Sequence, residues 1–281
     1  MNIDIICPLY KGENYIESLH KSILNQKNVS INNVKYILTQ TNDKSEDILK
    51  KLKCNYKVIK PSEFSHSLTR EETAMESVAD IIVFITQDIE IRNDDWLEKL
   101  VNPIINNEAA ASYSRQLTKY DNIEKYTREN NYPNTSIIKS KDDIEKLGLK
   151  TFFMSDASSA IKTDIFKKLN GYDHKNLPTN EDMYIAYKLI MNDYKIKYCA
   201  DSIIYHSHKF TLKQIYDRYK LTGEFFRANN YLDNYGTTTS GANLAKYILK
   251  RIIEEKNLKL IFRYPFDMVA RLIGMKAGKK S

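Results

Sequence analysis

The amino-acid sequence predicts an α/β fold, with a mostly parallel central sheet flanked by helices and a helical extension at the C-terminal end. Ile81–Ile85 is an unbroken apolar run, which is typical of a strand buried on both faces, and it leads into a polar tip that holds Asp88. Ligands of open α/β sheets bind beyond the carboxyl ends of the strands, so Asp88 is a candidate site residue. A solvated acid at the end of a strand explains it equally well.

The first hundred residues alternate between apolar strands and amphipathic helices, a spacing that indicates βαβ units and a parallel sheet. Ile16, Leu19 and Ile23 recur at helical spacing, and Ser45, followed by two acids, is typical of a helix N-terminus. We expect strands at 2–7 (ended by Pro8), 34–39, 56–59 and 80–85, and helices at 15–26, 45–52 and 69–78.

The remaining residues continue this pattern less regularly. We expect strands at 109–114, 151–161, 194–198 and 203–206, and helices at 96–105, 163–170, 181–192 and 212–229. The polar, aperiodic stretch 120–142 predicts a long loop, and 237–241 predicts a flexible break. Two basic amphipathic helices follow, one at 242–255 and one from Phe266 onward.

Several classes of protein are disfavoured by what the sequence lacks. The three cysteines at 7, 54 and 199 have no CxxC spacing, which argues against a disulfide framework and a zinc site. No GxGxxG, P-loop, GxSxG or HExxH motif occurs. We find neither a secretion-signal pattern at residues 1–7 nor an apolar run that could span a bilayer, and therefore expect a cytoplasmic protein.

The net charge of +7 is concentrated in the last forty residues. Residues 242–281 hold ten Lys or Arg and three acids, which accounts for the whole excess. A local basic segment favours an anionic membrane surface over a body that binds nucleic acid.

Four polar clusters could carry chemistry: residues 64–70, 86–88, 180–182 and 206–208. Asp88 with His206 or His208 would suit Mg²⁺ or Mn²⁺, although one surface and one packed histidine explain the pair as well. Glu181 and Asp182 could equally be acids that the dipole favours at a helix N-terminus. His66 and Arg70 could hold a diphosphate or face solvent.

Together, and in this order, seven motifs resemble the inverting family 2 glycosyltransferases of GT-A fold, most closely the bacterial dTDP-rhamnosyltransferase branch. The resemblance covers nearly the whole chain. The motifs are Cys7-Pro8-Leu9-Tyr10, Phe64-Ser65-His66-Ser67-Leu68-Thr69-Arg70, Phe84-Ile85-Thr86-Gln87-Asp88, Tyr113-Ser114-Arg115-Gln116, Ser155-Asp156-Ala157-Ser158, Asn180-Glu181-Asp182-Met183 and Tyr205-His206-Ser207-His208.

The resemblance implies a role for each matching residue. Asp182 would be the general base, with Glu181 beside it. Asp88 and His206 would bind a divalent metal, with His208 as the alternative ligand. The donor nucleotide would contact Pro8, Tyr10, Asn42, Asp43, His66, Arg70, Gln87 and Asp88. The acceptor would contact Arg115, Asp156 and Glu181.

Three positions depart from the family pattern. Thr86 replaces the first acid of the usual DxD motif, Asn42 replaces an acid of the nucleoside-binding turn, and Asp156 replaces an Asn. Asp88 is therefore the only acid of its motif, and Asp156 adds a negative charge near the expected site.

The expected organisation is a GT-A domain at 1–235, with a nucleotide-sugar half at 1–105 and an acceptor half at 106–235, and a basic tail at 236–281. In the tail, Leu244, Ile248, Ile252 and Ile253 share a helix face among basic residues, which favours an anionic lipid surface. Packing of this face on the domain, or a homodimer, is the alternative.

The expected function is inverting transfer of L-rhamnose from dTDP-L-rhamnose to a surface polysaccharide. The resemblance implies an acceptor linked to a lipid diphosphate, and so a peripheral position at the inner face of the cytoplasmic membrane. A UDP-hexose donor and a non-catalytic glycan-binding module are the alternatives.

Overall fold

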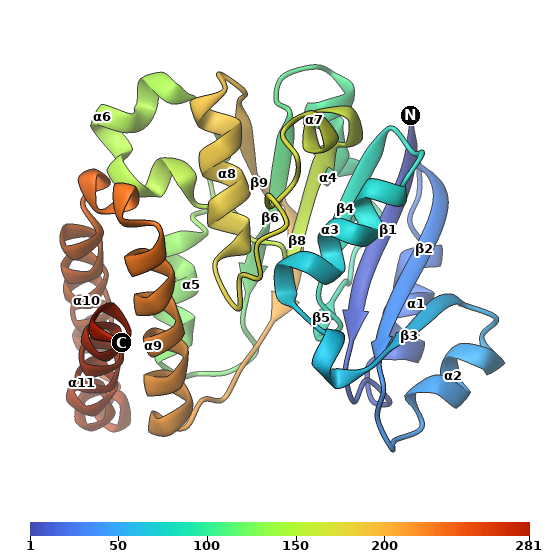
Figure 1. Ribbon diagram of the computed structural model, residues 1–281. Coiled ribbons are helices and arrows are strands. Elements are labelled where there is room, and N and C mark those ends of the chain that lie inside the picture. Colours follow the sequence, from blue (N-terminus) through green and yellow to red (C-terminus); the bar gives the residue numbers. More distant parts are fainter.

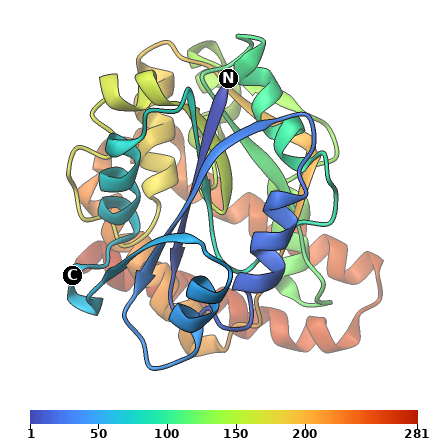
Figure 2. The same cartoon turned by 90° about the vertical axis from the view of Figure 1, so that its right-hand side faces the viewer.

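The computed structural model describes residues 1–281, apart from the side chain of Thr238. A nine-stranded sheet forms its centre, with helices on both faces (Figures 1 and 2). The strands are β1 (Asn2–Leu9), β2 (Ser30–Thr39), β3 (Asn55–Ile59), β4 (Ile81–Ile85), β5 (Ile89–Glu90), β6 (Ala111–Leu117), β7 (Ile137–Lys139), β8 (Ser158–Lys162) and β9 (Ile196–His206).

Helices separate most of these strands, and three helices follow the last one. They are α1 (Ile16–Leu24), α2 (Ser45–Lys51), α3 (His66–Glu76), α4 (Trp96–Ile105), α5 (Ile123–Asn131), α6 (Ile144–Leu147), α7 (Thr163–Lys168), α8 (Glu181–Met191), α9 (Leu212–Ala228), α10 (Thr237–Glu254) and α11 (Leu258–Lys280). Short 3₁₀ turns lie at Pro61–Glu63, Lys141–Asp143, Gly148–Phe152 and Asn230–Tyr235.

The strand order is β3-β2-β1-β4-β8-β6-β9-β5, and β7 pairs with β9. Strand β8 is antiparallel to both of its neighbours, whereas β1 pairs in parallel with β2 and β4, β2 with β3, and β6 with β9. Six strands therefore run in one direction, which confirms the predicted mostly parallel sheet. Their carboxyl ends lie along one edge, where ligands of such sheets bind.

Each face of the sheet has its own core. Alternate residues of β1 point to opposite faces, so Ile5 and Cys7 pack with α1, α2 and α4, and Ile6 packs with α3, α7 and α8. The strand continues through Pro8, where we expected it to end. Strand β4 pairs with β1 only at Ile3–Ile6, so the missing N–H of Pro8 breaks no ladder on that side.

Three expectations for residues 120–206 were also wrong. Residues 120–142 hold α5 and β7, because α5 is stabilised by packing on the C-terminal helices and has few apolar residues of its own. The two strands expected at 194–198 and 203–206 are one strand, β9, whose pairing with β6 shifts register between Ser114 and Arg115. Only 158–161 of the expected strand 151–161 is extended; Thr151 and Phe152 end a 3₁₀ turn, and 153–157 form a loop.

The C-terminal helices pack on the domain. Helix α10 begins at Thr237, directly after Gly236 in a left-handed conformation, so the expected break at 237–241 is helical. Ile248 and Ile252 are fully buried in a cluster with Ile123 and Tyr126 of α5, whereas Ile253 is 56% exposed. Figure 1 shows α5, α9, α10 and α11 gathered at one end of the sheet. Among the described helices none is long and apolar enough to cross a bilayer.

Helices α9 and α11 lie unusually close together, and glycines permit it. A Cβ atom on Gly278 would collide with the carbonyl oxygen of Lys220, and one on Gly274 with that of Tyr216. Buried Arg271 of α11 links this helix to α9 and α5, since it donates to Tyr219 of α9 at 2.8 Å and to Glu124 of α5 at 2.9 Å.

Replacing Gly278 with alanine should lower the free energy of unfolding by about 1–3 kcal/mol, because the added methyl group overpacks this contact. Gly241→Ala is the matched control, because nothing lies within 4 Å of a Cβ there. In the control, alanine should stabilise helix α10 by up to about 1 kcal/mol. Urea unfolding measures both variants, and equal stability changes would contradict the close packing.

Candidate active site

Asp88 and His206 are brought together by a short antiparallel pairing at the carboxyl edge of the sheet. Ile89 of β5 pairs with His206 of β9, and Glu90 pairs with Tyr205. Because Asp88 directly precedes Ile89, the pairing fixes its carboxylate beside the imidazole of His206. Residues far apart in the sequence thus meet at the end of the buried strand β4.

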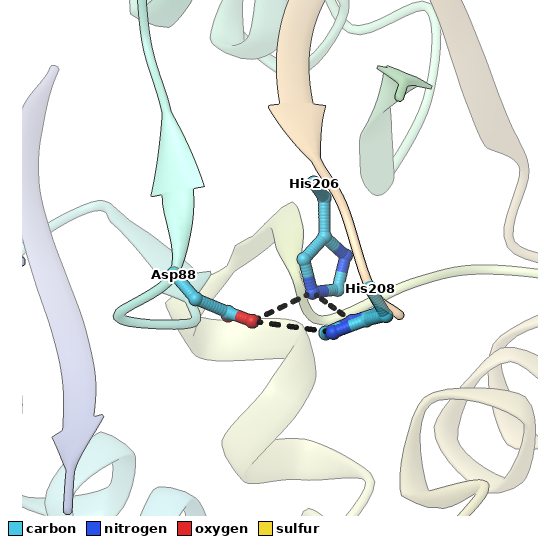
Figure 3. A group of neighbouring side chains, drawn as sticks. All are labelled: Asp88, His206 and His208. Carbon is cyan, nitrogen blue, oxygen red and sulfur yellow. Dashed lines mark hydrogen bonds and ion pairs between the residues drawn. The ribbon is translucent and has the colours of Figure 1, made fainter. Parts of the chain in front are cut away.

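Asp88, His206 and His208 form a compact cluster (Figure 3). The Oδ2 atom of Asp88 lies 3.4 Å from Nε2 of His206 and 3.7 Å from Nδ1 of His208. The Nε2 atoms of the two histidines are 2.8 Å apart. One ligand atom from each residue can be chosen so that all three lie within 4.8 Å of one another, a spacing that a single metal ion could bridge.

The electrostatics of the cluster suit a cation. Burial lowers the pKa of both imidazoles, that of His208 to about 3, so each ring is neutral at neutral pH and keeps one nitrogen lone pair. Burial alone would raise the pKa of Asp88, but its contacts with His206 and His208 hold it below the usual range. One carboxylate oxygen and two neutral imidazoles are ligands that Mn²⁺ accepts.

Gln116 of β6 fixes the tautomer of His206. Arg128 can only donate hydrogen bonds, so the amide atom that it contacts must be the carbonyl oxygen, Oε1. The same oxygen lies 3.0 Å from Nδ1 of His206, which must therefore carry the proton. Nε2 of His206 is left with a lone pair, which accepts from Nε2 of His208 at 2.8 Å and lies 3.4 Å from Oδ2 of Asp88, and which is available to a metal.

A second polar cluster surrounds the start of α8. Glu181 is buried and lies 3.3 Å from Nη1 of Arg70, which also donates to the carbonyl oxygen of His66 at 2.8 Å. Asp156 is buried beside them and accepts hydrogen bonds from Ser159 at 2.6 Å and Tyr172 at 2.7 Å. This cluster connects to the first, since Gln116 donates to Ser155, the neighbour of Asp156, at 2.8 Å.

Asp182 is the half-buried member of this second cluster. Burial raises its pKa well above the ordinary value, and the negative charges of Glu181 and Asp156 raise it further. The backbone N–H of Met183 donates to its Oδ1 at 2.8 Å. A carboxylate whose pKa is raised in this way is a better proton acceptor than an ordinary aspartate.

A cavity of about 480 Å³ opens at the ends of β1 and β2, and Tyr10, Asn42 and Asp43 line it. Gln87 borders it, because its side chain exchanges hydrogen bonds of 2.9 and 2.8 Å with the backbone of Tyr10. Four of the residues that the sequence assigned to the nucleotide are thus brought together.

The remaining predicted site residues are placed as follows. Pro8 lies in β1. His66 is the first residue of α3 and is exposed. Nε of Arg115 is buried without a hydrogen-bond partner among the described residues. Arg70 and Asp156, expected to contact the donor and the acceptor, are both buried, and their side chains are bonded to protein groups.

The sequence did not identify Gln116 or Arg128 as functional residues. Gln116 was visible as the last residue of a quoted motif, but nothing in the motif indicated its contact with His206. Arg128 lies in α5, within the stretch expected to be a loop, so no signal could have placed it.

The mostly parallel sheet, with an acid after β4 and a histidine at the end of β9, has the GT-A fold. Solved structures share this fold. The mannosyltransferase PcManGT of Pyrobaculum calidifontis, in complex with GDP-Man and Mn²⁺, is similar with a TM-score of 0.64 and 11% identity over 99% of this chain and 86% of its own. Staphylococcus aureus TarS, in complex with UDP-GlcNAc, has a TM-score of 0.58 and 14% identity over 100% and 92%.

The sequence comparisons define the family. The family model "Glycosyl transferase family 2" matches residues 4–170. O-antigen chain rhamnosyltransferase WbaN of Salmonella anatum is 34% identical over 86% of this chain and 78% of its own length. O-antigen chain rhamnosyltransferase RfbN of Salmonella typhimurium is 34% identical over 79% and 71%. The chain therefore belongs to glycosyltransferase family 2, and it is a glycosyltransferase.

Replacing Gln116 with leucine should weaken Mn²⁺ binding by about 10- to 100-fold, because His206 loses the acceptor that fixes its tautomer. Gln116→Glu is the matched control, since a carboxylate oxygen accepts from Arg128 and His206 as the amide oxygen does. It should bind Mn²⁺ at least as tightly as the unchanged protein. Isothermal titration with Mn²⁺ measures all three proteins, and equal weakening in both variants would contradict the proposed contact.

Proposed function

We propose that this protein transfers L-rhamnose from dTDP-L-rhamnose to a hydroxyl of a growing cell-surface polysaccharide, with inversion at the anomeric carbon. The choice of sugar and acceptor rests on the 34% identity to two O-antigen chain rhamnosyltransferases, over most of the chain. The Asp88 cluster and the raised pKa of Asp182 support the chemistry.

The donor would bind along the carboxyl edge of the sheet. The cavity at Tyr10, Asn42 and Asp43 would hold the nucleoside, with Gln87 fixing its wall, and Pro8 and His66 would be further donor contacts. Asp88 and His206, with His208, would hold Mg²⁺ or Mn²⁺. When bound, such an ion neutralises the charge that grows on the leaving diphosphate. Since Thr86 stands where a second acid is usual, Asp88 supplies the only carboxylate.

Asp182 would be the general base that takes the proton of the acceptor hydroxyl as it attacks. One base and one line of attack give a single displacement, and hence inversion. The leaving diphosphate needs no protonation, so the second carboxylate of a glycosidase has no counterpart. Glu181, held by Arg70, would orient the acceptor, and Arg115 would be a further acceptor contact.

Asp182→Asn should leave donor binding intact and lower transfer by about 10²- to 10⁴-fold, the usual contribution of a general base. It should also raise the thermal midpoint at neutral pH. A carboxyl whose folded-state pKa is raised loses stability as pH rises from its ordinary pKa through the raised one, and asparagine has no such loss.

Product formation and thermal unfolding, each followed against pH, test this prediction. The matched control is Asp164→Asn, an exposed acid in the first turn of α7, which should change neither quantity. Full transfer by Asp182→Asn would remove Asp182 as the base.

The donor itself is tested with a panel of nucleotide sugars, with and without Mn²⁺. Turnover of dTDP-L-rhamnose supports the proposal. Preference for a UDP-hexose would contradict the proposed donor but would still agree with the proposed reaction class. No turnover with any donor and a polysaccharide acceptor would instead favour a glycan-binding role.

We also propose that the GT-A domain ends at residue 235 and that residues 236–281 form a basic tail. We propose in addition that the protein lies peripherally on the cytoplasmic face of the membrane. The support is an apolar stripe along α11 that the protein leaves uncovered. Its side chains are between 52% and 75% exposed: Leu258, Phe262, Phe266, Val269, Leu272 and Ile273. Exposed Lys259, Lys276 and Lys280 border it, so an anionic lipid surface fits its charge. A second copy of the chain is the alternative occupant.

Phe262→Ser together with Phe266→Ser should weaken binding to phosphatidylglycerol vesicles by about tenfold or more, since each phenylalanine buries apolar surface in the lipid interface. Tyr15→Ser together with Leu24→Ser is the control, because these exposed side chains lie at α1. Vesicle sedimentation measures binding, and light scattering reports dimers. Unchanged vesicle binding, or loss of a dimer instead, would contradict the membrane role.

A further inference from the structure

A second cavity, of about 540 Å³, lies beside the Asp88 cluster. It is bounded by the segment between β6 and α5, the segment after β9, and the first turns of α11. Phe210 lines it, and its ring stacks on that of His208 with centroids 4.8 Å apart. The cavity therefore begins one side chain away from the proposed metal ligands.

The wall of this cavity is cationic. Lys119, Lys209, Lys259 and Arg263 line it. Lys119 pairs with Glu90, and Arg263 lies 3.8 Å from Asp267. Lys209 and Lys259 have no carboxylate within 4 Å among the side chains that the structure describes, although Lys209 lies over the ring of Tyr120 at 4.3 Å.

The acidic side chains that also line the cavity are paired with residues outside its wall. Glu124 and Asp267 each accept a hydrogen bond of 2.9 Å from Arg271, which lies outside the cavity wall. Asp121 accepts from Asn257 at 3.0 Å and lies 3.6 Å from Nζ of Lys125, which also lies outside the cavity wall. The cavity wall thus holds four bases and three acids, an excess of one positive charge, and Lys209 and Lys259 are the two bases with no acid partner among the described side chains.

Two helix N-termini add to this charge, because α5 and α11 both begin at the cavity. The first turn of a helix has backbone N–H groups without partners and carries a partial positive charge, which favours anions. Asn122, which precedes α5, makes no cap bond and donates its amide to the carbonyl oxygen of His208 at 2.9 Å. The N–H groups of the α5 first turn are thus left without a side-chain cap.

The cavity also adjoins apolar surface. Leu258 and Phe262, which are 69% and 75% exposed, flank Lys259 in the first turns of α11. A ligand that fits both features carries phosphate charge at one end and a lipid chain at the other.

We propose that this cavity binds the phosphate or diphosphate group of a lipid-linked acceptor, while its lipid chain lies along the α11 stripe and its sugar reaches the Asp88 cluster. The inference rests on the proposed function, and it names the part of the acceptor that the protein recognises. Lys209 and Lys259, with the α5 N-terminus, are the residues that would contact the phosphate.

The test uses the full chain and the double variant Lys209→Gln/Lys259→Gln. Lys213→Gln/Lys250→Gln is the matched control, because it removes the same charge from exposed positions outside the cavity. Isothermal titration without metal or donor measures binding of two probes, farnesyl diphosphate and inorganic pyrophosphate. The unchanged protein and the control should bind farnesyl diphosphate more tightly than pyrophosphate. The double variant should bind it at least about tenfold more weakly, as expected for lost charge-assisted contacts.

Three results would overturn the proposal: no binding of farnesyl diphosphate, equal binding of both probes, or equal weakening in the control variant. Equal binding of both probes would mean a site for free phosphate. Kinetics add a second measure, since the double variant should raise KM for a diphosphate-linked acceptor and leave KM for the donor unchanged. Failure of the proposed function would be seen separately, as absence of donor turnover while the probe still binds.

Discussion

The site depends on the antiparallel pairing of β5 with β9, which places Ile89 opposite His206. Without it, Asp88 would be a solvated acid at the end of β4, as one interpretation of the sequence allowed. With it, a carboxylate from the first half of the chain lies 3.4 Å from an imidazole of the second half. The antiparallel strand β8 joins the two halves, and its neighbours β4 and β6 therefore run in the same direction, so both contribute to one edge.

Buried polar side chains then set the chemistry of that edge. Gln116, anchored by Arg128, determines which nitrogen of His206 is unprotonated. It thereby fixes the ring in the tautomer that can bind a metal through Nε2. Arg70 offsets part of the cost of burying Glu181 and Asp156, whose charges raise the pKa of Asp182. The positive charge of Arg70 is thus used to stabilise the carboxylates of Glu181 and Asp156. We expect other cations to bind the phosphates of the substrates.

The sequence predicted the βαβ half well, because buried strands such as Ile81–Ile85 and amphipathic helices have strong periodicity. It predicted which residues would gather at the edge only through the order of its motifs. It could not predict α5, whose stability comes from Ile248 and Ile252 in distant helices, nor the burial of Arg70 and Asp156. Burial and hydrogen-bond partners depend on tertiary packing, which short motifs do not encode. The apolar face of α10 illustrates the same limit, since its spacing suited a lipid surface and a protein core equally.

The most direct measurement of the central claim is anomalous diffraction from crystals grown with Mn²⁺ and dTDP. A metal-assisted transferase predicts an anomalous peak in contact with the Asp88 carboxylate and with Nε2 of His206, adjacent to a diphosphate that leads to the cavity at Tyr10 and Asn42. A nucleotide bound in that cavity with no anomalous peak, or with a peak away from Asp88, would contradict the account.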